Sequence, residues 1–117
     1  MIRGYKELIV WQKAMELVEV IYRLMKKFPA DERFRLCDQL SRAVVSIPSN
    51  IAEGRGRQTD NDFRHFLFIA KGSCYELETQ LLICVRQCYL TNEDVKAALS
   101  LSDEVSRMLT SLIKTLS

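Results

Sequence analysis

The side chains that could bind a metal ion are few and widely spaced in this sequence. A di-iron site in a helical bundle needs a Glu-x-x-His step on each of two helices, and the chain has one histidine, His65. Asp62, its acidic neighbour at that spacing, stands where a helix is expected to start and is explained as a helix cap. Structural zinc favours Cys-x-x-Cys pairs, which the four cysteines do not form. The sequence therefore predicts no metal site and no cofactor.

Nucleophilic and acid–base catalysis also lack the groups that they need. A serine or cysteine nucleophile requires a nearby base, and His65 is the only histidine that could serve. The motif Gly-x-Ser-x-Gly does not occur, and Gly72 lies mid-helix, where it is expected to permit close helix packing. Carboxylates that could pair for acid–base work are Glu53, Glu76 and Glu78. Because solvated or helix-bridging carboxylates are far commoner, the sequence predicts a protein that is not an enzyme.

The remaining candidate for chemistry is the arginine turn, residues 53–59. Arg55 and Arg57 flank a glycine just before the helix start that is expected at Thr59. Backbone N–H groups at a helix N-terminus and arginine guanidinium groups both bind phosphate, so these two arginines are candidate nucleic-acid contacts. The alternative is an ordinary solvated turn, because two aspartates follow directly at the helix start. Additional basic residues lie at Arg33, Arg35, Arg42, Arg64 and Lys71, and of these Arg42 and Lys71 are secondary candidates.

Four segments of the chain have apolar residues at alternating steps of three and four, and these segments must position the side chains above. This spacing keeps one stripe of a helix facing its neighbours. The first stripe holds Leu8, Trp11, Met15, Val18, Tyr22 and Met25, and the second holds Cys37, Leu40, Val44, Ile47 and Ile51. The third holds Phe63, Leu67, Ala70, Cys74, Leu77, Leu81, Cys84 and Cys88, and the fourth holds Val95, Ala98, Ser102, Val105, Leu109, Leu112 and Leu116. Since all four cysteines lie on these stripes, we expect them to be reduced core residues.

The breaks between the segments agree with four helices. Phe28-Pro29-Ala30 is expected to end the first, because proline disfavours helical geometry in the preceding residue. Gly54-Arg55-Gly56 is expected to end the second through the left-handed geometry that glycine accepts. Two pairs resemble the capping boxes that open helices: Thr59 with Asp62, and Thr91 with Asp94. The short loops predict an all-α, antiparallel up-down-up-down four-helix bundle that forms a single domain, residues 1–117.

Two features depart from a simple bundle. Pro48 lies within the second helical segment, where it removes a backbone donor and clashes with the preceding turn, so a kink is expected. The first segment also has a second apolar stripe: Val10, Ala14, Leu17, Ile21, Leu24 and Phe28. This second stripe either widens the core contact or faces another subunit.

Composition and charge limit the class of protein further. The 117 residues are 48% hydrophobic and 27% charged, which indicates a globular, helix-rich chain. The net charge of +2 is too small to indicate nucleic-acid binding by itself. No segment reaches the roughly 18 consecutive apolar residues of a membrane helix, and the N-terminal residues lack the apolar block of a signal peptide. We therefore expect a cytoplasmic protein.

Three blocks of the sequence are similar to one known family. They are residues 8–14, residues 39–54, and residues 63–73 continued by residues 76–81. The second block is the most specific, because it contains Ser-Ile-Pro-Ser-Asn-Ile-Ala-Glu-Gly. Together the blocks resemble the four-helix bundle family of bacterial 23S rRNA intervening-sequence proteins, which is related to the accessory variability proteins of diversity-generating retroelements.

The resemblance implies a ring-like homopentamer that binds nucleic acid through a basic surface and, in retroelement members, a reverse transcriptase partner. Members of the family are not known as enzymes. It also implies a structural motif at the end of the second helix, made of Pro48, Ser49, Asn50, Glu53 and Gly54. Two interpretations stay open: an oligomeric module that binds RNA, DNA or a nucleoprotein partner, and a purely structural assembly protein with no nucleic-acid role.

Overall fold

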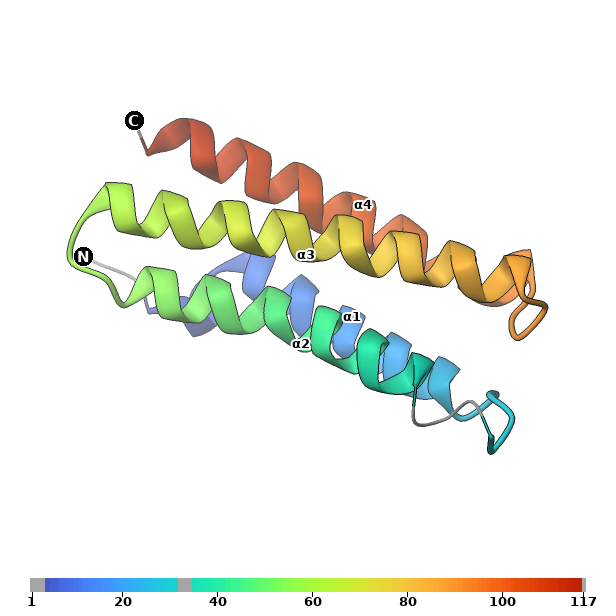
Figure 1. Cartoon of the computed structure of the whole chain (residues 1–117). Helices are drawn as coiled ribbons and strands as arrows, with labels where there is room; N and C mark the ends of the chain where they lie inside the picture. The colour runs from blue at the N-terminus through green and yellow to red at the C-terminus, as the bar shows by residue number, and fades with distance from the viewer. Residues whose placement is uncertain (1–3, 32–34, 117) are drawn as a thin grey trace.

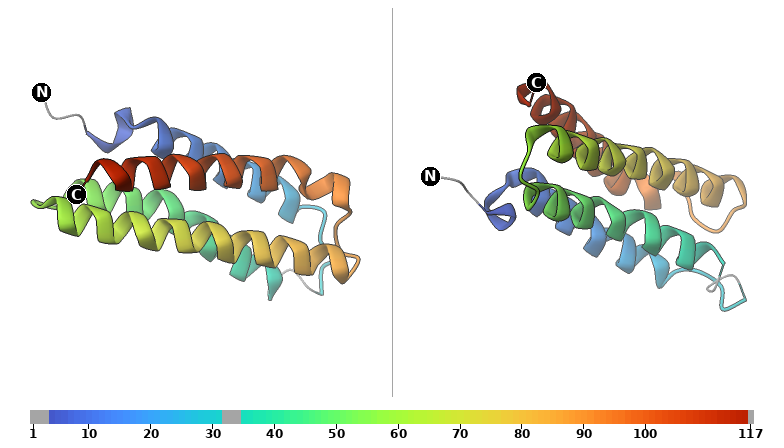
Figure 2. Two further views of the ribbon diagram at one scale, coloured as in Figure 1. Left: turned by 90° about the horizontal axis from the view of Figure 1, so that it is seen from above. Right: turned by 60° about the vertical axis from the view of Figure 1, so that its left-hand side comes forward.

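The computed structural model describes residues 4–31 and 35–116, which form a four-helix bundle that measures 47 × 21 × 20 Å (Figure 1). A short 3-10 helix, Tyr5–Glu7, precedes α1 (Ile9–Met25), α2 (Leu36–Arg55), α3 (Asp60–Arg86) and α4 (Asn92–Thr115). Successive helices run antiparallel, so the turn from α2 to α3 lies at the same end as the start of α1 and the end of α4 (Figure 2). Each helix packs against two neighbours, which leaves α1 diagonal to α3. The predicted up-down-up-down bundle is confirmed.

One apolar core runs through the bundle and contains residues from all four helices, among them Leu17, Leu40, Leu77 and Leu109. The predicted stripes of α2, α3 and α4 face this core along most of their length. The one serine in the α4 stripe, Ser102, donates a hydrogen bond of 2.7 Å to Glu78 Oε2 on α3, which satisfies its buried hydroxyl group. None of the helices in the described residues is long and apolar enough to cross a membrane.

The second apolar stripe of α1 widens the core contact, which is one of the two alternatives that the sequence leaves open. This stripe, from Val10 to Phe28, is buried between α2 and α4. The first stripe packs beside it and is only partly buried. The prediction that it faces the neighbouring helices is wrong for Met15 and Tyr22, which are exposed. Both stripes are apolar, and the core selects the one with small and aliphatic residues such as Ala14, because it allows two neighbouring helices to approach. An apolar strip of α1 is therefore left on the surface.

The helix starts follow the predicted capping. At α4 the capping box is complete, because the Thr91 N–H donates to Asp94 Oδ2 at 2.9 Å and the Asp94 N–H donates to Thr91 Oγ1 at 3.0 Å. At α3 the Asp62 N–H donates to Thr59 Oγ1 at 3.2 Å. The first helix, α1, ends at Met25, shortly before Pro29, as predicted.

The helix α2 ends at Arg55, as the Gly54-Arg55-Gly56 stop predicts, but its glycines act differently from the prediction. Gly56, which follows α2, has a φ of −81°, so no left-handed residue ends this helix. Gly54 lies inside α2, where an added Cβ would stand 2.6 Å from the Cβ of Phe66 on α3. Gly72, for which the packing role was predicted, has no atom within 4 Å of such a Cβ. Close packing of α2 against α3 therefore depends on Gly54.

Cys88 does not lie in the core, contrary to the prediction. The helix α3 ends at Arg86, and Cys88 adopts the left-handed conformation with a φ of 64°. Its N–H donates to the Val85 carbonyl at 3.0 Å, and the following Tyr89 N–H donates to the Cys84 carbonyl at 3.0 Å, which is the Schellman pattern of helix ends. The turn carries Cys88 out into solvent, whereas the other three cysteines are buried as predicted.

Candidate functional site

The arginine turn is organised by aromatic rings of α3. The carbon Cζ of Arg57 lies 4.8 Å from the centre of the Phe66 ring, and Arg57 Nη2 lies 2.9 Å from Glu53 Oε2. The Cζ of Arg55 lies 5.7 Å from the centre of the Phe63 ring. A cation over an aromatic face gains about 0.5–1 kcal/mol at exposed sites. The first two turns of α3 therefore hold both guanidinium groups beside the loop.

The start of α3 itself offers little to an anion. The Asp62 N–H, one of the free donors of the first turn, is occupied by Thr59 Oγ1. Asp60 and Asp62 both lie in that first turn, where their negative charge already interacts with the helix dipole. Any affinity of the turn for phosphate therefore depends on the guanidinium groups of Arg55 and Arg57.

The secondary candidates do not join this turn. Arg42 is paired with Asp38 at 3.1 Å, and it lies about 20 Å along α2 from Arg55, at 1.5 Å per residue. The Nζ of Lys71 lies 5.9 Å from the centre of the Tyr75 ring, farther along α3. The structure thus brings two of the four predicted nucleic-acid contacts together and leaves the other two apart.

One basic residue near the turn was not among the predicted contacts. The guanidinium of Arg64 lies 5.8 Å from the centre of the Phe68 ring, and its Nε is buried without a hydrogen-bond partner in the described residues. Arg64 and Phe68, like Lys71 and Tyr75, are four residues apart on α3 and hence on one side of the helix. This spacing is a signal in the sequence that could have found both pairs.

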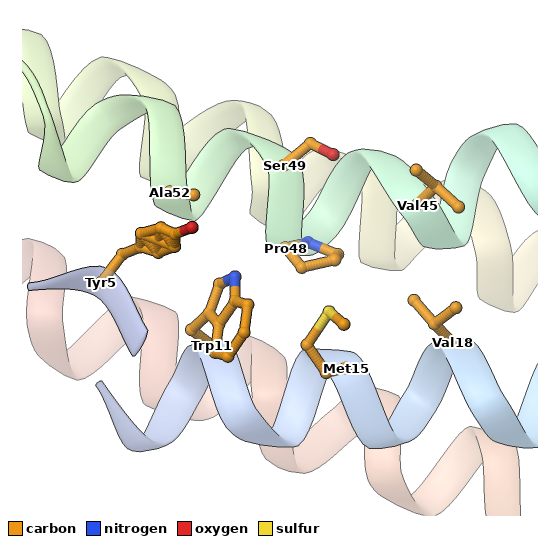
Figure 3. Close-up of a pocket in the computed structure, with 8 residues that line it drawn as sticks. All are labelled: Tyr5, Trp11, Met15, Val18, Val45, Pro48, Ser49 and Ala52. Atoms are coloured by element: carbon orange, nitrogen blue, oxygen red, sulfur yellow. The ribbon is translucent and has the colours of Figure 1, made fainter. Parts of the chain in front are cut away.

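Besides a hollow of about 290 Å³ at the start of α1, lined by Glu7, Leu8, Ile9, Val10, Met108 and Leu112, two apolar surfaces of the described residues run along the sides of the bundle. The first is the α1–α2 groove, which begins as a hollow of about 290 Å³ whose side chains face one another across the two helices (Figure 3). This hollow is lined by Tyr5, Trp11, Met15, Val18, Val45, Pro48, Ser49 and Ala52. A second hollow of the groove, about 320 Å³, is lined by Tyr22, Met25, Lys26 and Cys37. The second surface is the α3 ridge, which consists of the exposed Phe68, Ile69, Tyr75, Leu82 and Ile83.

Comparison with protein families agrees with this fold. The family described as 23S rRNA-intervening sequence protein matches residues 6–111. The chain belongs to this family. A solved structure described as a protein of unknown function of the S23 ribosomal protein family from Bacteroides thetaiotaomicron is 31% identical, with a TM-score of 0.84. The similarity covers 91% of this chain and 99% of that one. Comparison with curated proteins gives no match.

The part of α2 around Pro48, residues 46–54, has two sides. The helix α2 runs unbroken through Pro48, and the kink remains a prediction. Asn50 Nδ2 donates to the Ser46 carbonyl at 2.8 Å and to Ser46 Oγ at 2.9 Å, and Ser46 Oγ lies 2.9 Å from Ser73 Oγ on α3. Ser49 points the other way and lines the α1–α2 groove. The segment thus joins α2 to α3 on one side and shapes the groove on the other.

Nothing in this family member points to catalysis. Burial raises the pKa of the Cys74 thiol to about 12, although a hydrogen bond with Ser102 lowers it. Burial likewise raises the pKa of Cys84 to about 11, so both remain protonated thiols at neutral pH and are poor nucleophiles. His65 is exposed, with its ring 5.8 Å from that of Phe66. No group of three histidine, cysteine or acidic side chains in the described part of the chain could hold a metal ion.

Proposed function

We propose that this protein is a non-catalytic cytoplasmic homo-oligomer, a pentamer by the family resemblance, that binds nucleic acid or a nucleoprotein partner through the arginine turn. The observation that supports this proposal is the pair of guanidinium groups, Arg55 and Arg57, held over the rings of Phe63 and Phe66. Partly exposed arginines at the end of a bundle suit contacts with phosphate groups, which position a polyanion without reading its sequence. The family's connection with 23S rRNA makes structured RNA the first ligand to test.

The strength of binding depends on assembly. Each neutralised phosphate contributes about −0.9 to the slope of log K against log salt concentration on duplex DNA. One turn with two arginines would therefore give a slope of about −2, whereas five turns on one polyanion would give up to about −9. Linked turns also raise the effective concentration of each for the same polyanion. A single chain should bind weakly, and the oligomer should bind with a steep dependence on salt.

The test is binding of structured RNA and duplex DNA across a salt series, by fluorescence anisotropy. The double variant Arg55→Ala/Arg57→Ala should bind more weakly and with a shallower salt slope, while light scattering shows the oligomer unchanged. Arg107→Ala is the matched control, because Arg107 forms the same kind of ion pair four residues apart, with Asp103 on α4. If the double variant and the control bind alike, the turn is only a solvated turn.

The alternative function is a purely structural assembly protein with no nucleic-acid role. The local charge balance favours it, since Glu53, Asp60 and Asp62 surround the two arginines of the turn. Failure of the parent protein to bind RNA or DNA at low salt would make this alternative the better account. A clean monomer by light scattering at micromolar concentration would contradict both.

A further inference from the structure

The α3 ridge is an apolar surface on the side of α3 that faces away from the core. Phe68, Tyr75 and Leu82 recur every seven residues and so form one line along the helix, with Ile69 and Ile83 beside it. Their exposed fractions lie between 39% and 52%. No other helix covers this line in the described residues, because α3 packs only against α2 and α4. The ridge is therefore free to contact another molecule.

The α1–α2 groove is the corresponding concave surface. Its exposed apolar side chains are Met15 and Val45, which line the hollow drawn in Figure 3, and Tyr22, which lines the second hollow. Their exposed fractions lie between 40% and 46%. At about 1.5 Å per residue the groove from Trp11 to Met25 is roughly 21 Å long, and the ridge from Phe68 to Ile83 is roughly 22 Å long. A single helix can thus lie along the whole groove.

We propose that the α3 ridge of one copy of this chain packs into the α1–α2 groove of the next copy. This pairing gives the contact surface for the self-association in the proposed function and rests on it. Since α1 and α3 are diagonal within the bundle, no chain can cover its own groove with its own ridge. A contact between two ridges would leave the groove open, whereas the head-to-tail contact covers both surfaces with one kind of interface.

The area of the two surfaces agrees with a stable interface. With about 150–250 Å² for an aromatic side chain, the partly exposed ridge residues present roughly 450 Å² of apolar surface. The three exposed side chains of the groove add roughly 250 Å² on the same basis. A standard interface buries about 1,600 Å² in total, of which roughly 900 Å² is apolar. Ridge and groove together present roughly 700 Å², which is most of that apolar area, whereas neither surface presents more than about half of it alone.

The two surfaces also lie at the same height in the bundle. Val45 of the groove is next to Ser46, whose Oγ lies 2.9 Å from the Oγ of Ser73 in the middle of the ridge segment. A copy related by rotation about an axis along the bundle therefore brings its ridge to the neighbour's groove without sliding. Such rotation keeps all copies pointing the same way, which is the arrangement of a closed ring.

Charged residues mark the two sides of the ridge. Lys71 lies seven residues before Glu78, which is hydrogen-bonded to α4, so Lys71 is on the α4 side. Glu76 lies one turn from Ser73, which is hydrogen-bonded to α2, so Glu76 is on the α2 side. The α4 side of the ridge thus carries Lys71 together with Glu78, and the α2 side carries Glu76.

The rims of the groove also carry charges. Glu19 lies one turn from both Met15 and Tyr22 on α1, and Arg42, which is paired with Asp38 at 3.1 Å, lies one turn from Val45 on α2. In a neighbour of the same orientation the α4 side of the ridge faces α1 and its α2 side faces α2. Lys71 then faces the rim with Glu19, and Glu76 faces the rim with Arg42, but Glu78 and Asp38 lie on the same two sides and offset these attractions. The head-to-tail orientation therefore rests on the shared height of ridge and groove rather than on charge.

A mixing experiment tests this pairing. Tyr75→Glu places a charge on the ridge and Val45→Glu places one in the groove, and both sites are exposed, so each variant should keep the helical circular dichroism spectrum of the parent. Each variant alone should be monomeric, because all of its copies share one damaged surface. An equimolar mixture should form a heterodimer with twice the monomer mass, because the intact ridge of Val45→Glu fits the intact groove of Tyr75→Glu. Ser100→Glu, on the exposed face of α4, should assemble as the parent does.

Light scattering and sedimentation distinguish the outcomes. Assembly of Val45→Glu as in the parent, with loss of assembly only in Tyr75→Glu, would indicate a ridge-to-ridge contact and overturn the pairing. Monomers that persist in the mixture at high concentration would overturn it as well. A monomeric parent would contradict the self-association itself, while the RNA salt slope reports separately on the nucleic-acid part of the proposed function.

Discussion

Gly54→Ala should destabilise the bundle even though alanine is the better helix former. The added Cβ would lie 2.6 Å from the Cβ of Phe66 and 3.1 Å from the Cδ1 of Phe63. Carbon atoms pack at about 3.5–4.0 Å, so α2 and α3 would have to separate by roughly 1 Å. Rotation of the Phe66 side chain cannot relieve this contact, because its Cβ is attached directly to the backbone.

The expected magnitude follows from two opposing effects. Overpacking of a well-packed contact costs about 1–3 kcal/mol, and the upper half applies where backbone must move. Replacing a glycine within a helix by alanine returns about 0.5–1 kcal/mol. The free energy of unfolding should therefore fall by about 1–2 kcal/mol. In a domain of this size that corresponds to a fall in Tm of roughly 4–8 °C.

Urea unfolding followed by circular dichroism measures this change. Gly56→Ala is the matched control, because Gly56 has a φ of −81° and its nearest neighbour would be an ordinary 3.5 Å from the new Cβ. The control should gain about 0.4–1 kcal/mol. Both variants and the parent are compared at one protein concentration, since association adds to apparent stability. If Gly54→Ala gains stability as Gly56→Ala does, the close approach of α2 and α3 does not depend on Gly54.

Two further predictions concern ionisable groups. Among the four cysteines, Cys88 alone should react rapidly with a thiol reagent in the folded protein, because the other three are buried. Burial also raises the pKa of Cys74 to about 12 and that of Cys84 to about 11. Mass spectrometry that finds two rapidly labelled sites would contradict this prediction. The Lys27 ammonium and the Thr91 N–H lower the pKa of Asp94 from 3.8 to about 2. Its carboxylate therefore stabilises the fold above about pH 4, and this stabilisation is lost as the pH falls to 2. The variant Asp94→Asn should accordingly show a smaller acid-induced loss of stability over that range than the parent. Identical curves of stability against pH for the two proteins would refute the contribution of Asp94.

The helices of this protein are predictable because each buries a stripe that can be recognised from its own residues. The orientation of α1 cannot be predicted in this way, because both of its stripes are apolar and packing against α2 and α4 determines which stripe is buried. The stripe with Ala14 and Leu17 fits between those helices, whereas Trp11 and Met15 border the groove. Helical periodicity locates a buried face but cannot rank two adjacent apolar faces. For this reason the sequence leaves open whether the second stripe faces the core or another subunit, and it places Met15 and Tyr22 wrongly.

The candidate site is predictable only where its features are local. The position of Arg55 and Arg57 before the capped start of α3 follows from neighbouring residues. Their contact with the aromatic rings of α3 does not follow from neighbouring residues, because it requires the close approach of α2 and α3 that Gly54 permits. A glycine near a helix end is ordinarily interpreted as a stop signal instead. The exposure of Cys88 similarly depends on α3 ending at Arg86, before the apolar stripe does. These features become visible only when two helices are placed side by side.

The positions of the two proposed contact surfaces explain how a chain with a net charge of +2 could bind a polyanion. The ridge and the groove run along the sides of the bundle, whereas the arginine turn lies at its end (Figure 1). The proposed contacts between copies along the sides would therefore leave every turn free. In a closed ring whose copies all point the same way, the turns would lie on one rim. A polyanion that crossed this rim would meet several pairs of arginines in succession, and the effective concentration of each pair would rise with the first contact. The small net charge of one chain therefore argues against binding by the monomer, but it does not argue against binding by an oligomer.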